Sequence, residues 1–577
     1  MILMVITLTT LNAQERRKIE IQFAPFMTFD ESKPDATILT RDNSKQVHIK
    51  HEGIEMWCDE AIYDAKQDFI EAYGKVKIKQ GDTINMVSKY VEYSGKTKLA
   101  FASGDVILKD PSSTITTDTL FFDRTKQEAF FENNGKVDRD TSGTITSVIG
   151  RYFMKTKKYQ FVKNVKLVNP KYIIESNQLD FYSVSGYAFL YGPTTITSKT
   201  SVIYCERGFY NTSEDTGYFV KKSKINYNER IVEGDSIYFD RNKSYASATN
   251  NITITDTLNN TIVKGHYGEV FRDKDSLYIT QRALAITLQE NDSIFIHSDT
   301  LMVTGKPKKR IIRAYYNAKV YKSDLSGLAD SIHINQNIGL TQLINIDKSK
   351  NKDVFLKKKK PVLWNIQNQI TGDSIHLISN VKTENLDSLK VFNNAFVINK
   401  DSLGDGYNQI SGKKLFGLFQ ENSLSTIDVV KNAETLYYLR NEFNELVGID
   451  KSKSGAIKIW LTNNAIDEMK KSNQIGGKTY PELEFPENEK IIRGFNWRES
   501  ERPKSKLDLF KDDPPLVLKV IKGLDAYVPP VEFFDSNLLD RIEKSQPKSS
   551  IKKSKKFRKN SNKSARKIPK SLLKNNK

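Results

Sequence analysis

The feature that most constrains this chain is a repeat of about 30 residues, which runs from about Trp57 to Val303. Each copy contains a short acidic and aromatic segment, clearest at residues 59–64, 118–123 and 235–240. From the first copy to the last, the steps between corresponding aromatic residues are 30, 29, 31, 29, 28, 29 and 32 residues. These aromatic residues are Tyr63, Tyr93, Phe122, Phe153, Tyr182, Tyr210, Phe239 and Phe271. A fixed period of this size predicts a stack of similar units that bury their apolar faces against one another. We expect such a molecule to work through a long surface.

The residues within each copy have the pattern of β-strands. After Gly74, the apolar residues Val76 and Ile78 alternate with three lysines. Side chains alternate between the two faces of a strand, so this pattern predicts a sheet with one buried face and one solvated face. No window of the region has capped, helically spaced apolar residues. We therefore predict an all-β fold, a stacked antiparallel β-repeat.

Two recurring residue types have alternative interpretations. The first is a glycine or asparagine about ten residues after each aromatic residue, at Gly74, Gly104, Gly135, Asn164 and Gly192. Glycine reaches positive φ without strain, which favours a corner or bulge over a ligand contact. The second is the aromatic series itself, which predicts a ladder of cross-strand core pairs, with a role in lining a groove as the alternative.

Composition and charge divide the chain into five expected parts. Fourteen lysines and arginines lie in residues 544–577, which contain no acidic residue, so the rest of the chain has a net charge of only +5. Such a tail cannot pack, and we expect it to be disordered, with contact to a membrane surface as a further role and nucleic acid disfavoured. The parts are a short signal peptide (1–13), a β-repeat domain (14–305), a more divergent β-repeat region (306–460), an irregular linker and docking segment (461–543) and the tail (544–577). Within the fourth part, residues 465–470 suggest a short helix. The apolar start that ends at Ala13 predicts secretion, and no later stretch is long enough for a transmembrane helix.

The sequence contains little that could perform chemistry. Cys58 and Cys205 each lie five residues before an aromatic residue of the repeat, five repeats apart, so we expect two free thiols embedded in strands. The six histidines include one close pair, His48 and His51, without a set of metal ligands. There is no phosphate-binding loop, nucleophile elbow or zincin helix. We predict neither an enzyme nor a cofactor.

The repeat, the secretory start and the segments Gly-Lys-Val-Lys-Ile at Gly74 and Gly-Asp-Val-Ile-Leu at Gly104 together resemble the OstA/LptA family of lipopolysaccharide-transport proteins. The chain is most similar to the long OstA-like proteins of that family, best over residues 45–305 and more faintly to residue 460. The resemblance implies a V-shaped β-jellyroll with an apolar trough, which carries the acyl chains of lipopolysaccharide across the periplasm to the outer membrane. It also implies edge-strand docking to an inner-membrane complex and to an outer-membrane barrel.

The apolar residues that follow the glycine anchors are the candidate lining of this lipid groove. They are Val76, Ile78, Val106, Leu108, Val137, Val165, Leu167, Ile196, Ile252 and Ile254. The same residues suit a filled β-core, so a structural or adhesive β-solenoid remains the main alternative. A polysaccharide-active β-helix enzyme would need a cluster of acidic and basic residues on one sheet face, and none stands out.

Overall fold

The computed structural model describes residues 18–30, 33–139, 143–289, 292–306, 309–346, 360–383, 385–421, 423–462 and 465–521. Most of these residues lie in antiparallel β-strands, and in these ranges the helical elements are five 3-10 turns (η1–η5). The predicted all-β fold is therefore confirmed. The expected signal peptide and the lysine-rich tail lie outside the described residues.

The described residues form two compact units, unit 1 up to Gly217 and unit 2 from Tyr218 onward. The strands of unit 1 are β1 (Glu20–Phe23), β2 (Phe26–Asp30), β3 (Lys33–Thr40), β4 (Val47–His51), β5 (Ile54–Cys58), β6 (Glu60–Asp64), β7 (Phe69–Gln80), β8 (Ile84–Ser94), β9 (Leu99–Asp110), β10 (Ser113–Asp123), β11 (Glu128–Phe131), β12 (Gly135–Arg139), β13 (Gly143–Ser147), β14 (Ile149–Phe153), β15 (Lys158–Asn169), β16 (Tyr172–Tyr182), β17 (Tyr187–Ser198) and β18 (Ser201–Asn211). The next strand, β19 (Thr216–Tyr227), begins two residues before the boundary.

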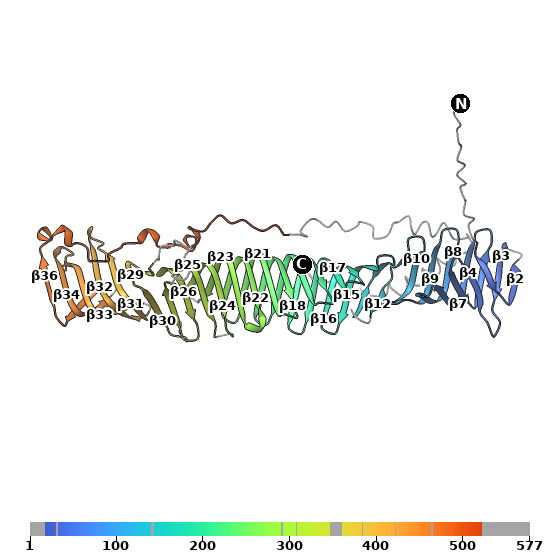
Figure 1. The fold of residues 1–577 in the computed structure, drawn as a ribbon, viewed down its shortest axis with the longest axis horizontal. Helices are drawn as coiled ribbons and strands as arrows, with labels where there is room; N and C mark the ends of the chain where they lie inside the picture. Colours follow the sequence, from blue (N-terminus) through green and yellow to red (C-terminus); the bar gives the residue numbers. More distant parts are fainter. Residues whose placement is uncertain are drawn as a thin grey trace, which may run out of the picture. The chain divides into compact units, whose positions relative to one another are not determined.

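Unit 2 continues with long strands that lie side by side in chain order from β20 to β26 (Figure 1). They are β20 (Arg230–Asp240), β21 (Tyr245–Asp256), β22 (Thr261–Phe271), β23 (Ser276–Leu288), β24 (Ser293–Thr304), β25 (Ile311–Lys322), β26 (Leu325–Asn335), β27 (Leu340–Ile344), β28 (Val362–Asn365), β29 (Asn368–Thr371), β30 (Ser374–Ser379), β31 (Leu386–Lys400), β32 (Tyr407–Gln420), β33 (Ser423–Arg440), β34 (Leu446–Thr462), β35 (Ala465–Ser472) and β36 (Gly476–Tyr480). The 3-10 turns are η1 (Arg272–Lys274), η2 (Glu482–Glu484), η3 (Glu487–Glu489), η4 (Glu499–Glu501) and η5 (Asp508–Phe510).

A step in the middle of each long strand divides it into two segments. β7 pairs with β8 over Phe69–Tyr73 and again over Val76–Gln80, and the register shifts between Tyr73 and Val76. Gly74 and Lys75 at the step have φ angles of 69° and 40°. The segments on the Val76 side of successive strands pair with one another and are called arm A. Those on the Phe69 side form arm B.

The step explains the glycine anchors. Left-handed residues recur at 74–75, 104–105, 163–164, 192, 221–222, 250–251, 281–282, 316–317, 393–394 and 431–432. At the third anchor the left-handed residue is Asn134 (φ 61°) and not Gly135. The predicted corner is confirmed, and it continues beyond residue 303 with lysine, asparagine and other residues in the left-handed region. Asparagine tolerates this conformation better than most residues, so the anchor loses its glycine without losing its geometry.

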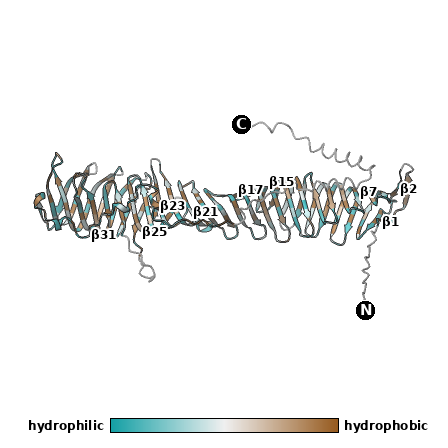
Figure 2. Cartoon of the chain, turned by 90° about the horizontal axis from the view of Figure 1, so that it is seen from above, coloured by the Kyte–Doolittle hydropathy of each residue, from teal (hydrophilic) through white to brown (hydrophobic). Residues whose placement is uncertain are grey.

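Apolar residues face the interior in register from strand to strand. In arm A, Val76 is 1% exposed while Lys75, Lys77 and Lys79 are exposed. The alternation of hydrophobic and hydrophilic residues along the strands is visible in Figure 2. One continuous ladder of paired residues in unit 1 consists of Ile49, Met56, Ile78, Met86, Leu108, Ile115, Val137, Ile145, Leu167, Ile174, Ile196 and Ile203.

Strand pairing continues well beyond the repeat seen in the sequence. β24 pairs with β25 across residues 305 and 306, and β33 and β34 reach 18 and 17 residues. The domain boundary expected at residue 305 stays a prediction, and the two compact units meet elsewhere, after Gly217. The short helix expected at residues 465–470 is wrong, because these residues form β35 and pair with β34. The open edge of β34 offers a full ladder of hydrogen bonds, which outweighs a weak local preference for helix.

After β36 the chain turns back along unit 2. This return segment (residues 481–521, orange-red in Figure 1) is bound by side-chain amides that imitate strand pairing. Gln409 donates to the carbonyl of Lys490 (2.8 Å) and accepts from the amide of Ile492 (2.9 Å). Gln369 holds Asn496 and Arg498 in the same way, at 2.7 Å for both bonds.

The return segment also buries apolar side chains and continues as far as β21. Phe485 and Ile492 join a core cluster with Phe396, Ile398, Leu436 and Ile449. Near the end of the segment, the side chain of Asn250 donates to the carbonyl of Lys519 (2.7 Å) and accepts from the backbone amide of Lys519 (3.2 Å). Residues 481–521, the middle part of the predicted linker and docking segment, thus pack against the strands of unit 2.

Candidate functional site

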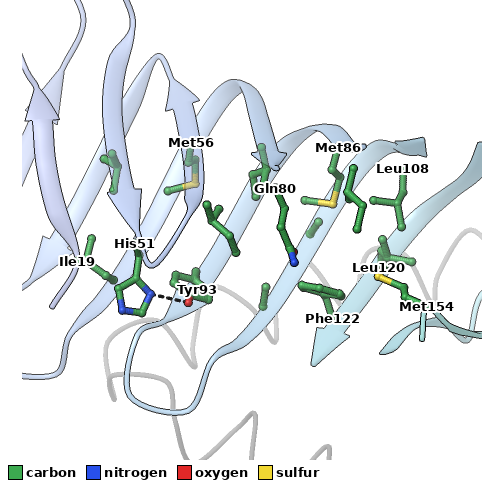
Figure 3. Close-up of a pocket in the computed structure, with 16 residues that line it drawn as sticks. Ile19, His51, Met56, Gln80, Met86, Tyr93, Leu108, Leu120, Phe122 and Met154 are labelled. Atoms are coloured by element: carbon green, nitrogen blue, oxygen red, sulfur yellow. Dashed lines mark hydrogen bonds between the residues drawn. The ribbon is translucent and has the colours of Figure 1, made fainter. Parts of the chain in front are cut away.

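A largely apolar cavity lies in unit 1, between arm A and arm B (Figure 3). It encloses about 740 Å³, part of it open to solvent. Arm A contributes Met56, Ile78, Met86 and Leu108. The remaining lining residues are Ile19, Ile49, His51, Ile54, Gln80, Ile84, Tyr93, Ala100, Ala102, Leu120, Phe122 and Met154.

Arm B lines the cavity with small side chains as well as with the larger Tyr93 and Phe122. Ala100 and Ala102 of β9 line it from arm B, whereas arm A presents isoleucine, methionine and leucine. Further along arm B the corresponding positions are Tyr152, Tyr159 and Phe181, which pair in register and are at most 2% exposed. The rings of Tyr152 and Tyr159 stack with centroids 4.1 Å apart. The interior is therefore open beside β4–β10 and filled by aromatic rings beside β14–β16.

Polar contacts join the outer edges of the two arms above the cavity. His51 Nδ1 lies 2.7 Å from the hydroxyl of Tyr93, and burial raises the pKa of this tyrosine to about 12. Glu52 accepts from Lys98 (2.8 Å) and from Arg124 (3.2 Å). The hydrogen bond from Lys98 is the main cause that lowers the pKa of Glu52. These charges lie at the rim, while the cavity beneath them is apolar.

Similar contacts recur along the edges of unit 1. Each joins residues 42 to 47 positions apart, which is about one and a half repeats. We call them edge ties; besides His51–Tyr93 and Glu52–Lys98 they are Gln80–Gln127, Asp110–Tyr152, Ser113–Tyr159, Arg139–Ser183 and Lys171–Asp215. The constant offset follows from the antiparallel stack, in which the two ends of each strand lie on opposite edges. The edge ties therefore bridge the opening between arm A and arm B, which we call the mouth.

The ten candidate groove residues divide into two groups. Ile78 and Leu108 line the unit 1 cavity, and Ile254 lines a smaller cavity in unit 2. The other seven, Val76, Val106, Val137, Val165, Leu167, Ile196 and Ile252, are buried at 2% exposure or less. Whether any of them contacts lipid stays a prediction.

Some aromatic residues of the repeat line the cavity, and others lie in the buried core. Tyr93 and Phe122 line the cavity, and Tyr210 is fully buried. In β14 and β16 the preceding residues, Tyr152 and Phe181, take the buried position, and Phe153 and Tyr182 are half-buried.

Sequence reasoning missed the lining residues that do not follow a glycine anchor. Met86 pairs with both Ile78 and Leu108, yet it lies on the strand that leads into the next aromatic segment. Met56 has the corresponding place on β5. In β8 the alternate residues Met86, Ser88 and Tyr90 are all buried. This period of two could have identified Met86 as an inward-facing residue from the sequence.

Unit 2 contains two further cavities. The larger encloses about 750 Å³, with apolar walls such as Val320, Leu343 and Leu377 and polar groups such as Lys322 and Asp324 at its rim. The smaller, of about 330 Å³, includes the buried Arg230 and Arg310.

Other kinds of site have little support in the described residues. No group of three or more His, Cys, Asp or Glu residues there could hold a metal ion. Cys58 and Cys205 are free and buried, as predicted, and burial raises the pKa of each thiol to about 12. No helix in the part of the chain that the structure describes is long and apolar enough to span a membrane.

Comparison with protein families matches residues 16–177 to the family described as OstA-like protein. Residues 16–177 form an OstA-like domain. All residues that line the unit 1 cavity lie inside the matched range, so the cavity belongs to the OstA-like domain itself. No curated protein matches the chain.

Among solved structures, LptH of Pseudomonas aeruginosa is similar to part of this OstA-like chain. It is described as the LptA homologous periplasmic component of the conserved lipopolysaccharide transport device. The match covers 23% of this chain and 92% of LptH, with 14% identity and a TM-score of 0.20.

Proposed function

We propose that this OstA-like protein is a periplasmic lipid-binding bridge protein, which carries the acyl chains of lipopolysaccharide along an apolar β-groove toward the outer membrane. The observation that supports this function is the cavity between the two arms of the OstA-like domain, lined by aliphatic side chains from both. Its chemistry suits the binding of acyl chains.

The energetics of lipid transfer explain why such a protein needs a shielded interior. Exposing a buried CH₂ group costs about 0.8 kcal/mol, so an acyl chain of a dozen carbons would cost roughly 10 kcal/mol to expose to water. The residues Ile78, Met86 and Leu108 offer that chain an apolar surface. The rim charges of Glu52 and Lys98 would keep polar head groups outside.

The edge ties add a condition to this function. An acyl chain that enters between arm A and arm B must break contacts such as His51–Tyr93 and Glu52–Lys98. His51–Tyr93 is a single buried hydrogen bond and Glu52–Lys98 is a partly exposed ion pair. Each contributes about 1 kcal/mol, so thermal fluctuations can open the space between the arms locally.

An edge strand suits the docking of a partner protein in the transport path. β2 pairs with β3 along one side, and its residues Phe26, Met27 and Phe29 are 58%, 49% and 75% exposed. Exposed strands with apolar side chains favour pairing with another chain. We assign this strand to contact with a neighbouring transport component at one membrane.

Site-specific photocrosslinking in the cell envelope tests the proposed function. A crosslinking amino acid at Ile78 or Leu108 should form adducts with lipopolysaccharide. Lys77 and Lys109 are exposed on the same strands and serve as matched controls that should not. Absence of adducts at both cavity positions, with normal expression and folding, would rule out acyl-chain transport through this cavity.

A structural β-solenoid is the second candidate, and the aromatic filling of unit 1 at Tyr152, Tyr159 and Phe181 favours it. It predicts that the unit 1 cavity stays empty of lipid in the cell. Lipid adducts at Leu108 would exclude it.

A further inference from the structure

The smaller cavity of unit 2 differs from the unit 1 cavity because two guanidinium groups lie in its wall. Arg230 begins β20 and Arg310 precedes β25, and they are 4% and 3% exposed. Other polar lining residues are Thr261 and Gln336. The apolar floor is formed by Ile254, Val263, Leu277, Val303 and Ile312.

A single carboxylate, that of the half-buried Asp256, contacts both arginines. Oδ2 of Asp256 lies 3.2 Å from Nη2 of Arg310 and 3.6 Å from Nε of Arg230. Its other oxygen accepts hydrogen bonds from the backbone and the side-chain amide of Asn259, at 3.1 and 2.8 Å. The next acid, Asp275, is 36% exposed and lies 3.9 Å from Arg310, beyond hydrogen-bonding distance.

Arg310 also donates to the backbone carbonyls of Gly305 and Asp275, and Arg230 donates to the hydroxyl of Tyr227. One guanidinium donor is left over. Nε of Arg310 is buried without a hydrogen-bond partner among the described residues. Burial lowers the pKa of Arg310, and the positive charge of Arg230 lowers it further. A buried cation without a full set of acceptors is costly, and an anion in the cavity would remove that cost.

We propose that this cavity is a binding site for a phosphate group, held by Arg230 and Arg310. Guanidinium groups bind phosphate oxygens through paired, charge-assisted hydrogen bonds, and an aliphatic floor beside them suits a phosphate attached to an apolar or sugar moiety. Asp256 acts as the internal counter-ion that occupies the arginines while the site is empty.

This inference deepens the proposed function, because lipopolysaccharide carries phosphate groups on its lipid-bearing sugars. A phosphate held in unit 2 would anchor the head group while acyl chains occupy apolar space. The same chemistry could serve free phosphate, so the test separates the two sources.

Isothermal titration calorimetry of the full chain with inorganic phosphate, against chloride at equal ionic strength, is the direct test. The wild type should show saturable binding of one phosphate. Arg310→Gln and Arg230→Gln should each weaken binding at least tenfold. The matched control Arg440→Gln removes a part-buried arginine of unit 2 that is paired with Asp401, and should change phosphate affinity less than twofold.

Asp256→Asn separates a binding role from a structural one. It keeps both guanidiniums and removes their internal counter-ion, so phosphate affinity should rise severalfold even if the fold is less stable. The absence of saturable phosphate binding by the wild type would overturn the proposal. So would affinities within twofold of the wild type in both Arg310→Gln and Asp256→Asn.

Competition identifies the source of the phosphate. If the site serves the lipid, phosphate displaces lipopolysaccharide and Arg310→Gln weakens binding of lipopolysaccharide but not of its dephosphorylated form. If it serves the free ion, the two ligands bind independently. Either result supports the site, and crosslinking at Leu108 in unit 1 reports separately on acyl-chain transport.

Discussion

The ammonium group of Lys171 lies 2.6 Å from the carboxylate of Asp215, 44 residues further along the chain, and this ion pair joins the two edges of unit 1. The side chain of Asp215 is only 3% exposed, whereas that of Lys171 is 63% exposed. The pair is one of the edge ties that bridge the mouth between the arms.

Loss of this tie should destabilise unit 1. Lys171→Ala leaves a buried carboxylate without its cation, and we expect the free energy of unfolding to fall by about 1–3 kcal/mol in urea denaturation. Lys89→Ala is the matched control, because Lys89 and Asp105 form an ion pair with side chains 72% and 77% exposed. That change should lower the free energy of unfolding much less, because water screens an exposed ion pair. Equal effects would show that the edge tie contributes no more than a surface pair.

Filling the unit 1 cavity should separate lipid binding from stability. Ala102→Phe places a ring in open space, so the variant should keep its melting temperature and lose most binding of lipopolysaccharide or of a fluorescent acyl probe. Ala188→Phe is the contrasting change, because Ala188 is fully buried between its strand neighbours Phe181 and Tyr210. There, overpacking should lower stability by about 1–3 kcal/mol. Acyl-probe binding that is unaffected by Ala102→Phe would place the lipid elsewhere.

The side-chain amide of Gln369 acts as a clamp on the return segment, and its removal should loosen that segment. Gln369→Leu leaves the carbonyl of Asn496 and the amide of Arg498 without partners, which costs about 1–3 kcal/mol. We expect faster hydrogen exchange at Arg498 and proteolysis within residues 487–511. Gln342→Leu, which removes a half-buried amide bonded to His376 instead, should leave both unchanged. Unchanged exchange in Gln369→Leu would mean that the clamp does not hold the segment.

The two cysteines should be inert in the folded protein. Because burial raises the pKa of Cys58 and Cys205 from 9.0 to about 12, few thiolates exist at pH 8.5, and iodoacetamide should label both only after unfolding in urea. The sign of the pH effect follows from the raised pKa. The stability contributed by the protonated thiols is complete below pH 9 and falls as the pH rises toward 12. Rapid labelling of the native protein at pH 8.5 would contradict the buried placement.

The strand pattern was readable from sequence where local chemistry alone decides it. Val76 and Ile78 alternate with lysines, so one face had to be buried, and Gly74 and Gly104 marked the corner because they need positive φ. The corner is not readable where lysines replace the glycine, as at Lys221–Lys222. Nor is β35, because the partner strand and not the local sequence determines its conformation.

The sequence by itself determined the period, the strands and the apolar face, since these depend on residues within one or two repeats. The tertiary structure alone decided where the interior is open, because that depends on side chains from different strands facing each other, such as Met86 of arm A and Ala102 of arm B. It also decided the edge ties, the docking of the return segment on Gln369 and Gln409, and the pairing of Arg310 with Asp256, which is 54 residues away. Each is a contact between residues far apart in the chain, which antiparallel stacking brings together and which local periodicity does not encode.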